Sequence, residues 1–259
     1  MCDKCISLTK SNRRSIQGSQ RLKSARELEM IADLGKYFAR VAKNLGSSYR
    51  EAGQFGIDAA ITQSEPALED ILLENNAKTA AQLGNWQMLQ LEGKSVKWHD
   101  FRCKIFEREI AVQLQSFIEQ QVTASVFIIS ETSRKLAAGI VAKLIEEGES
   151  TQTIARTLRK EFNALTPFRS ARIARTEVGV VGSKAQNQGA KNLNAQSKQW
   201  LALDDDRTRN PHNSVDGMVI GIDEFFRPDG EAMQHPHDQS QGAGAGNIIN
   251  CRCDVLYSR

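Results

Sequence analysis

Apolar residues recur at steps of three and four along most of this chain, a spacing that predicts amphipathic helices. The clearest example runs from Ser24, a residue type that caps helices, to about Leu45. Its apolar face is formed by Leu28, Ile31, Leu34, Phe38, Val41 and Leu45. Gly46 is expected to end this helix, and the polar residues 1–20 are expected to form a loose tail.

The same periodicity predicts four further helices before residue 168. Their expected spans are Ser64 to Gly84, about Trp98 to Ile129, Ser130 or Ser133 to Gly148, and Ser150 to Pro167. The β-branched run that ends the second of these would equally suit a strand. Residues 168–191 are helical in composition, and their three glycines would allow close packing against a neighbouring helix.

The pattern changes near Lys198, where short apolar runs alternate with turn-forming residues. Strands are predicted from Trp200 to Leu203, over residues 218–220, and from Ile248 to Tyr257. Between them lie a charged turn at residues 204–212, a tight turn at Asp216-Gly217 and a glycine-rich loop at residues 238–247. The predicted fold class is α+β, with a mostly helical N-terminal two-thirds and a small C-terminal unit rich in strands and loops.

Charge is unevenly distributed along the 259 residues, although the net charge is only +3. Residues 1–50 hold eleven Lys or Arg against four Asp or Glu, a net of +7. Such a segment suits nucleic acid or an acidic protein face, and is equally compatible with a solvated helix surface. No apolar run approaches the roughly 20 residues that cross a bilayer, and the N-terminus lacks a secretory signal, so no membrane association is expected.

Cysteine and histidine side chains gather near the C-terminus and suggest a metal site. His212, His235 and His237 precede the pair Cys251 and Cys253. Alternate residues of a strand share a face, so the two sulfur atoms are expected on one side. Two thiolates with two imidazoles would suit a structural zinc ion. A strained disulfide within the pair, or two buried thiols beside solvated histidines, are the alternatives.

Three of the five cysteines lie outside this stretch. Cys2 and Cys5 form a lone CxxC at the chain terminus, which is a weak metal or redox signal. Cys103 falls within a helical pattern and is interpreted as a buried small hydrophobe.

The charged turn supports a second hypothesis, a metal-dependent nuclease. Asp204, Asp206, His212 and His235 would hold a divalent ion that activates water against a phosphodiester. The alternative is a solvated charge cluster. The sequence shows no phosphate loop, catalytic triad spacing or dinucleotide fingerprint, so the chain is expected not to be an enzyme.

Structural roles are expected for several neighbours of these residues. Trp200 is interpreted as the hydrophobic anchor of the small unit. Arg207 and Arg209 are expected to pair with nearby aspartates, Asp206 among them, and with backbone carbonyls.

Several motifs occur in a fixed order along the chain. They are Ile-Ala-Arg-Thr-Glu-Val at residues 173–178, then Trp200, Asp206-Arg207-Thr208-Arg209, His212, Asp216-Gly217, a proline-bearing loop and Asn250-Cys251-Arg252-Cys253. This combination resembles the Mu F-like minor head protein family of tailed phages and prophages, also called the head morphogenesis family. The resemblance covers residues 130–257.

The resemblance implies a minor capsid component, present in few copies, that associates with the portal protein, with other capsid proteins or with packaged double-stranded DNA. It implies location in the virion head, and in the host cytoplasm during assembly. Some relatives carry the domain fused to toxin or enzyme domains, and the resemblance assigns no catalytic residue. We expect a basic helical module over residues 1–125, which docks on portal or DNA, and a Mu F-like domain over residues 130–257.

Overall fold

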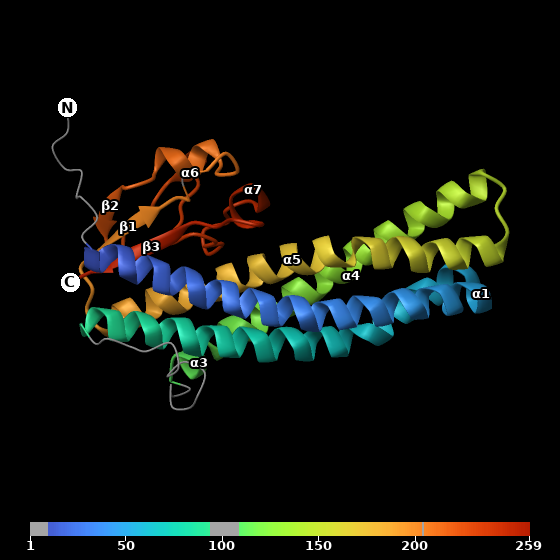
Figure 1. Ribbon diagram of the computed structural model, residues 1–259, viewed down its shortest axis with the longest axis horizontal. Helices are drawn as coiled ribbons and strands as arrows, with labels where there is room; N and C mark the ends of the chain where they lie inside the picture. The colour runs from blue at the N-terminus through green and yellow to red at the C-terminus, as the bar shows by residue number, and fades with distance from the viewer. Residues whose placement is uncertain (1–9, 94–108, 204) are drawn as a thin grey trace. The chain divides into compact units, whose positions relative to one another are not determined.

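The computed structural model describes residues 10–93, 109–203 and 205–259 (Figure 1). The N-terminal cysteine pair, Cys103 and Asp204 therefore lie outside the described residues. Contacts divide the chain into two compact units. Unit 1 comprises Met1–Glu27, Asn76–Gln115 and Arg175–Arg259, and unit 2 comprises Leu28–Asn75 and Ser116–Ala174. Both units are discontinuous in sequence, whereas the predicted domains 1–125 and 130–257 are continuous, and that division stays a prediction.

The predicted α+β class is confirmed. The helices are α1 (Lys10–Leu91), α3 (Glu109–Gln113), α4 (Gln115–Glu146), α5 (Thr151–Asn192), α6 (Asn210–Ser214) and α7 (Ala245–Ile248), with a 3-10 turn at Pro228–Gly230. The strands are β1 (Ser197–Leu201), β2 (Val219–Gly221) and β3 (Asp254–Ser258). Within the described ranges, no helix is long and apolar enough to cross a membrane.

Helix α1 continues past several residues at which a helix was expected to begin or end. Residues 10–20 are helical, so the expectation of a loose tail over residues 1–20 is wrong for this part. Gly46 lies inside the helix, where a Cβ atom would stand 2.8 Å from the carbonyl oxygen of Ala155. This glycine therefore allows close helix packing and does not end the helix. The interruption comes at Ala52 and Gly53, which leave helical geometry, Gly53 with a φ of 58°.

Serine hydroxyls expected to cap helices bond inside them instead. Ser64 donates to the Ala60 carbonyl at 2.7 Å and Ser133 donates to the Ile129 carbonyl at 2.8 Å, each one turn back. Helix α4 is therefore unbroken from residue 115 to 146, and its β-branched run is helical. Pro167 likewise lies inside α5 and does not stop it.

The boundary between α4 and α5 was predicted correctly. Gly148 adopts a left-handed φ of 74°, and the Ser150 hydroxyl accepts a hydrogen bond from the Thr153 backbone N–H at 3.2 Å.

A buried arginine organises part of the core of unit 2. The Arg169 guanidinium lies 4.4 Å from the ring centre of Phe38 and 5.7 Å from that of Phe162. It also donates to the Ser133 hydroxyl at 2.7 Å. Burial lowers the pKa of Arg169 to about 10. One cation thus connects side chains from α1, α4 and α5.

The C-terminal strands of unit 1 form one antiparallel sheet in the order β2-β1-β3 (Figure 1). Trp200 on β1 is fully buried and meets the Phe226 ring edge-on, with 5.2 Å between ring centres. The sheet packs near α5. Helix α5 in turn packs against α1. Its Gly189 approaches α1 so closely that a Cβ atom would stand 2.6 Å from the Gly84 carbonyl oxygen. The expected close packing of the α5 glycines is therefore observed in unit 1.

Lys198 is buried in the centre of this sheet and is only 1% exposed. Its Nζ donates to the Ile222 carbonyl at 2.7 Å and lies 5.7 Å from the ring centre of Phe226. Burial lowers the pKa of Lys198 from 10.5 to about 8.

This depressed pKa predicts a specific pH dependence of stability. Between pH 8 and 10.5 the unfolded chain binds more protons at this lysine than the folded chain, so Lys198 makes stability rise with pH. A Lys198→Met variant lacks this rise. Its free energy of unfolding relative to the wild type is expected to fall by about 2–3 kcal/mol between pH 7 and 10.5. Urea unfolding at both pH values measures this difference, and a difference that stays constant would contradict the prediction.

Candidate metal centre

Three potential metal ligands meet in the interior of unit 1. His212 belongs to α6, and Cys251 and Cys253 belong to the segment between α7 and β3. All three are buried, and their donor atoms lie within 4.8 Å of one another. The His212 Nδ1 atom lies 3.5 Å from the Cys251 sulfur and 3.4 Å from the Cys253 sulfur. Both cysteines are free thiols, so the alternative of a disulfide within the pair is not realised.

The cysteine segment turns where a strand was predicted. Asn250 has a left-handed φ of 60°, and the Cys253 backbone N–H donates to the Cys251 sulfur at 3.4 Å. Strand β3 begins only at Asp254. The tight turn, and not strand alternation, therefore brings both sulfur atoms to the same imidazole.

Two arginine contacts hold the segments that carry these ligands. Arg252 binds Asp205 through two hydrogen bonds of 2.6 Å, and these lower the pKa of Asp205 below its usual range. Arg209, just before α6, donates to the Ile249 carbonyl. These contacts join the charged turn to the cysteine segment, as was expected for Arg209. Arg207 lies 3.7 Å from Asp205 but is mostly exposed.

A chain of hydrogen bonds determines the tautomer of His212. Its Nε2 lies 3.0 Å from the Asn247 side-chain oxygen, and the Asn247 amide donates to Glu231 at 2.6 Å. A carboxylate only accepts hydrogen bonds, so the amide nitrogen of Asn247 must face Glu231. The Asn247 oxygen therefore accepts a hydrogen bond from the His212 Nε2–H. In the neutral imidazole this tautomer leaves Nδ1 without a proton, with its lone pair toward the two sulfur atoms.

Glu231 is itself held in the charged form. It accepts hydrogen bonds from the Asn247 side chain and from the Gly244 backbone N–H at 3.0 Å. These two bonds lower the pKa of Glu231 below its usual value. Glu231 therefore remains ionised at neutral pH and accepts the hydrogen bond from Asn247.

The two cysteine thiols shift each other's pKa strongly. A hydrogen bond from Cys253 lowers the pKa of the Cys251 thiol well below its usual value, and the same contact raises the pKa of Cys253. The pair therefore loses its first proton readily and retains the second, unless a cation is present.

The other two predicted histidine ligands are buried nearby. His235 Nδ1 bonds to the Pro236 carbonyl at 2.9 Å, and burial lowers the pKa of His235 to about 4. His237 has a left-handed φ of 67°, and its Nδ1 has no hydrogen-bond partner. His237 helps to lower the pKa of Cys251. Among the described residues, however, neither His235 nor His237 belongs to the group of donor atoms that lie within 4.8 Å of one another.

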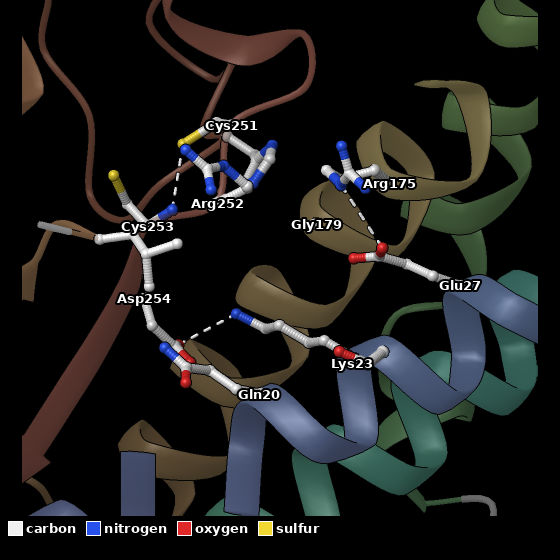
Figure 2. A pocket seen from close by; sticks show the side chains of 12 residues that line it. Gln20, Lys23, Glu27, Arg175, Gly179, Cys251, Arg252, Cys253 and Asp254 are labelled. Atoms are coloured by element: carbon white, nitrogen blue, oxygen red, sulfur yellow. Dashed lines mark hydrogen bonds and ion pairs between the residues drawn. The ribbon is translucent and has the colours of Figure 1, made fainter. Parts of the chain in front are cut away.

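A cavity of about 250 Å³ lies beside the two cysteines and His237 (Figure 2). Two ion pairs line its walls: Lys23 with Asp254 at 3.0 Å, and Arg175 with Glu27 at 3.4 Å. Burial raises the pKa of Glu27, and Arg175 opposes this rise. Both cysteines and these two ion pairs therefore line the same cavity.

The remaining predicted residues have the following positions. Trp200 is fully buried, with its ring centre 5.5 Å from that of His212, and its role as an anchor stays a prediction. Asp216 accepts a hydrogen bond from the Ala202 backbone at 2.7 Å, and Gly217 adopts a φ of 72° in the predicted turn. Asp206 is exposed.

Asp206, one of the two carboxylates of the nuclease hypothesis, does not lie in the ligand group of His212. Among the described residues, that group includes none of Asp206, His235 and His237. Asp204, the other proposed ligand, lies outside the described residues. The donor set that the structure brings together is one imidazole and two thiols.

Comparison with known proteins identifies the segment that carries this cluster. The family described as Phage Mu protein F like protein matches residues 138–256. Residues 138–256 belong to the phage Mu F-like family. The resemblance predicted over residues 130–257 is thereby confirmed.

Three relatives of this chain are informative. The Minor head protein GP7 of Bacillus phage SPP1 is 34% identical over 138 residues, which cover 50% of this chain and 41% of that protein. The uncharacterized protein YqbB of Bacillus subtilis is 29% identical over 131 residues, 49% of this chain and 42% of YqbB. The matched part is thus less than half the length of either relative. No solved structure is a significant match.

A third relative corrects the expectation about enzymes. The NAD(+)--arginine ADP-ribosyltransferase EFV of Enterococcus faecalis is 33% identical over 130 residues, which cover 49% of this chain and 26% of that protein. The expectation that the chain is not an enzyme is therefore contradicted, because a matched relative bears an enzyme name. The sequence search for catalytic motifs did not reveal this relationship.

Proposed function

We propose that this Mu F-like chain is a minor head component of a tailed phage or prophage, and that it acts in head morphogenesis by docking on the portal protein. The observation that carries the proposal is the family match over residues 138–256, together with a relative named a minor head protein. The corresponding location is the virion head, reached from the host cytoplasm during assembly.

Large apolar side chains on unit 2 support a protein partner. Phe55 on α1 is 85% exposed and Phe168 on α5 is 77% exposed, and Phe127 on α4 is also exposed. Exposed aromatic side chains of this size are typical of surfaces that another protein covers. They provide specific positions at which the proposed contact with the portal can be tested.

Double-stranded DNA is the second proposed partner. Helix α1 exposes the cations Arg21, Lys36, Arg40, Lys43 and Arg50. Binding that rests on such cations neutralises phosphates and releases counterions, so it would weaken steeply with salt. The exposed aromatic side chains favour the portal as the first partner to examine.

Co-expression with the portal protein of the same phage tests the proposal. The full chain is expected to co-purify with the portal through affinity capture and size-exclusion chromatography. A Phe55→Ser/Phe168→Ser variant is expected to lose about tenfold or more of the captured portal, because aromatic anchors dominate such contacts. The matched Phe55→Tyr/Phe168→Tyr variant keeps the rings and should retain binding. Failure of the wild-type chain to retain any portal protein would contradict the proposal.

A further inference from the structure

We propose that His212, Cys251 and Cys253 bind one Zn²⁺ ion and that His237 is the fourth ligand. The site would join α6 to the segment before β3, which lie about 40 residues apart in the sequence. The inference does not depend on the head function. It rests on how the donor atoms are presented, on what surrounds the sulfur atoms, and on the position of His237.

The imidazole of His212 is oriented as a metal ligand. The Glu231–Asn247–His212 relay places a proton on Nε2 and leaves Nδ1 facing both sulfur atoms at 3.4 and 3.5 Å. Metal-bound histidines almost always donate their second ring N–H to an oxygen acceptor in this way. A histidine that served only to fill the core would not require a charged carboxylate to set its tautomer.

The Cys251 sulfur accepts a hydrogen bond from the backbone. The Cys253 backbone N–H donates to it at 3.4 Å. Such a donor stabilises a thiolate far more than a neutral thiol, because sulfur accepts hydrogen bonds strongly only when it is charged. Two buried thiolates in contact require a cation between them. The nearby Arg252 is already engaged by Asp205, so it does not supply that charge.

His237 lies beside this set. Among the described residues its ring nitrogens are not part of the group of donor atoms that lie within 4.8 Å of one another, but it is 2% exposed, lines the same cavity as both cysteines, and has an Nδ1 without a hydrogen-bond partner. Its ring occupies space that only a glycine leaves free, because a Cβ atom on Gly179 would lie 2.3 Å from it. A buried imidazole with an unused nitrogen, held in a left-handed backbone conformation beside two thiols, is costly unless it binds something.

The ligand chemistry selects zinc. Two thiolates and two neutral imidazoles form a four-coordinate nitrogen and sulfur set, which is the usual composition of structural zinc sites. Two thiolate charges neutralise the dication, and binding releases the thiol protons to solvent. The cavity beside the cysteines provides the entry path for the ion.

Metal analysis of the full-length chain, purified without chelator, tests the proposal. About one equivalent of zinc per chain is expected. Replacement of zinc by Co²⁺ should give the visible bands of a tetrahedral ion and thiolate-to-metal charge-transfer bands in the near ultraviolet. Less than about 0.2 equivalents of zinc, even after incubation with ZnCl₂, would overturn the proposal.

Variants locate the ion. Cys251→Ser and Cys253→Ser should each lose the charge-transfer intensity and most of the zinc, and Asn247→Leu should weaken zinc affinity about 10- to 100-fold by releasing His212. The matched control Cys2→Ser/Cys5→Ser should keep one equivalent. Loss of zinc in that control would place the ion at the N-terminus and overturn the site proposed.

His237→Ala separates the fourth ligand from the other three. We expect at least tenfold weaker zinc binding and a Co²⁺ spectrum altered from that of the wild type. Unchanged affinity and an unchanged spectrum would overturn the role of His237. Circular dichroism of each variant, recorded with and without zinc, distinguishes loss of the ligand from failure to fold.

Discussion

Replacement of Trp200 by alanine is expected to lower the free energy of unfolding by about 3–5 kcal/mol. Trp200 is fully buried between Phe226 and His212, with ring-centre distances of 5.2 and 5.5 Å. Its removal leaves a large cavity between these two rings. Urea unfolding followed by circular dichroism measures the change.

An exposed aromatic residue provides the matched control for this substitution. Phe168 is 77% exposed, so Phe168→Ala should change stability by no more than about 0.5 kcal/mol. Similar small effects of both substitutions would show that Trp200 does not anchor the C-terminal sheet.

Removal of zinc is expected to lower the free energy of unfolding by an amount comparable to the effect of Trp200→Ala. A ligand that binds only the folded chain stabilises it by about 4 kcal/mol when its free concentration is a thousandfold above Kd. The free energy of unfolding of the wild-type chain in excess zinc should exceed that in EDTA by about this amount. The unfolding transition affected should be that of unit 1, because the ion joins α6 to the cysteine segment.

The Cys253→Ser variant is the control for nonspecific effects of the chelator. Its stability should be nearly the same in zinc and in EDTA, because one of the two thiolates is missing. A wild-type chain whose unfolding is identical in the two buffers would contradict a stabilising metal.

Local patterns predicted much of this fold. The periodicity around Leu34, Phe38 and Leu45 identified a buried helical face, and these side chains are indeed buried. Leu28 shared the pattern but is exposed. Helix boundaries were less predictable, because Gly46 and Ser64 have roles set by neighbouring helices and by bonds to the preceding turn. Such roles depend on tertiary contacts that the sequence alone does not display.

The candidate site was predictable only in part. The clustering of histidine and cysteine near the C-terminus pointed to His212, Cys251 and Cys253, which the structure brings together. The relay through Asn247 and Glu231 was missed, since Asn247 ends a glycine-rich stretch that resembles a flexible loop. The two hydrogen bonds of this relay join residues that are 35 and 16 positions apart in the sequence. Bonds over such separations leave no periodic signal in the sequence.

The most direct test of the account is the protein composition of purified heads. Heads from the phage or prophage that encodes this chain should be analysed by quantitative mass spectrometry, with heads from a strain lacking the gene as the control. We expect the chain in wild-type heads, in a few copies relative to the major capsid protein and at a constant ratio to the portal. Its complete absence from heads that contain normal amounts of portal would contradict the proposed function.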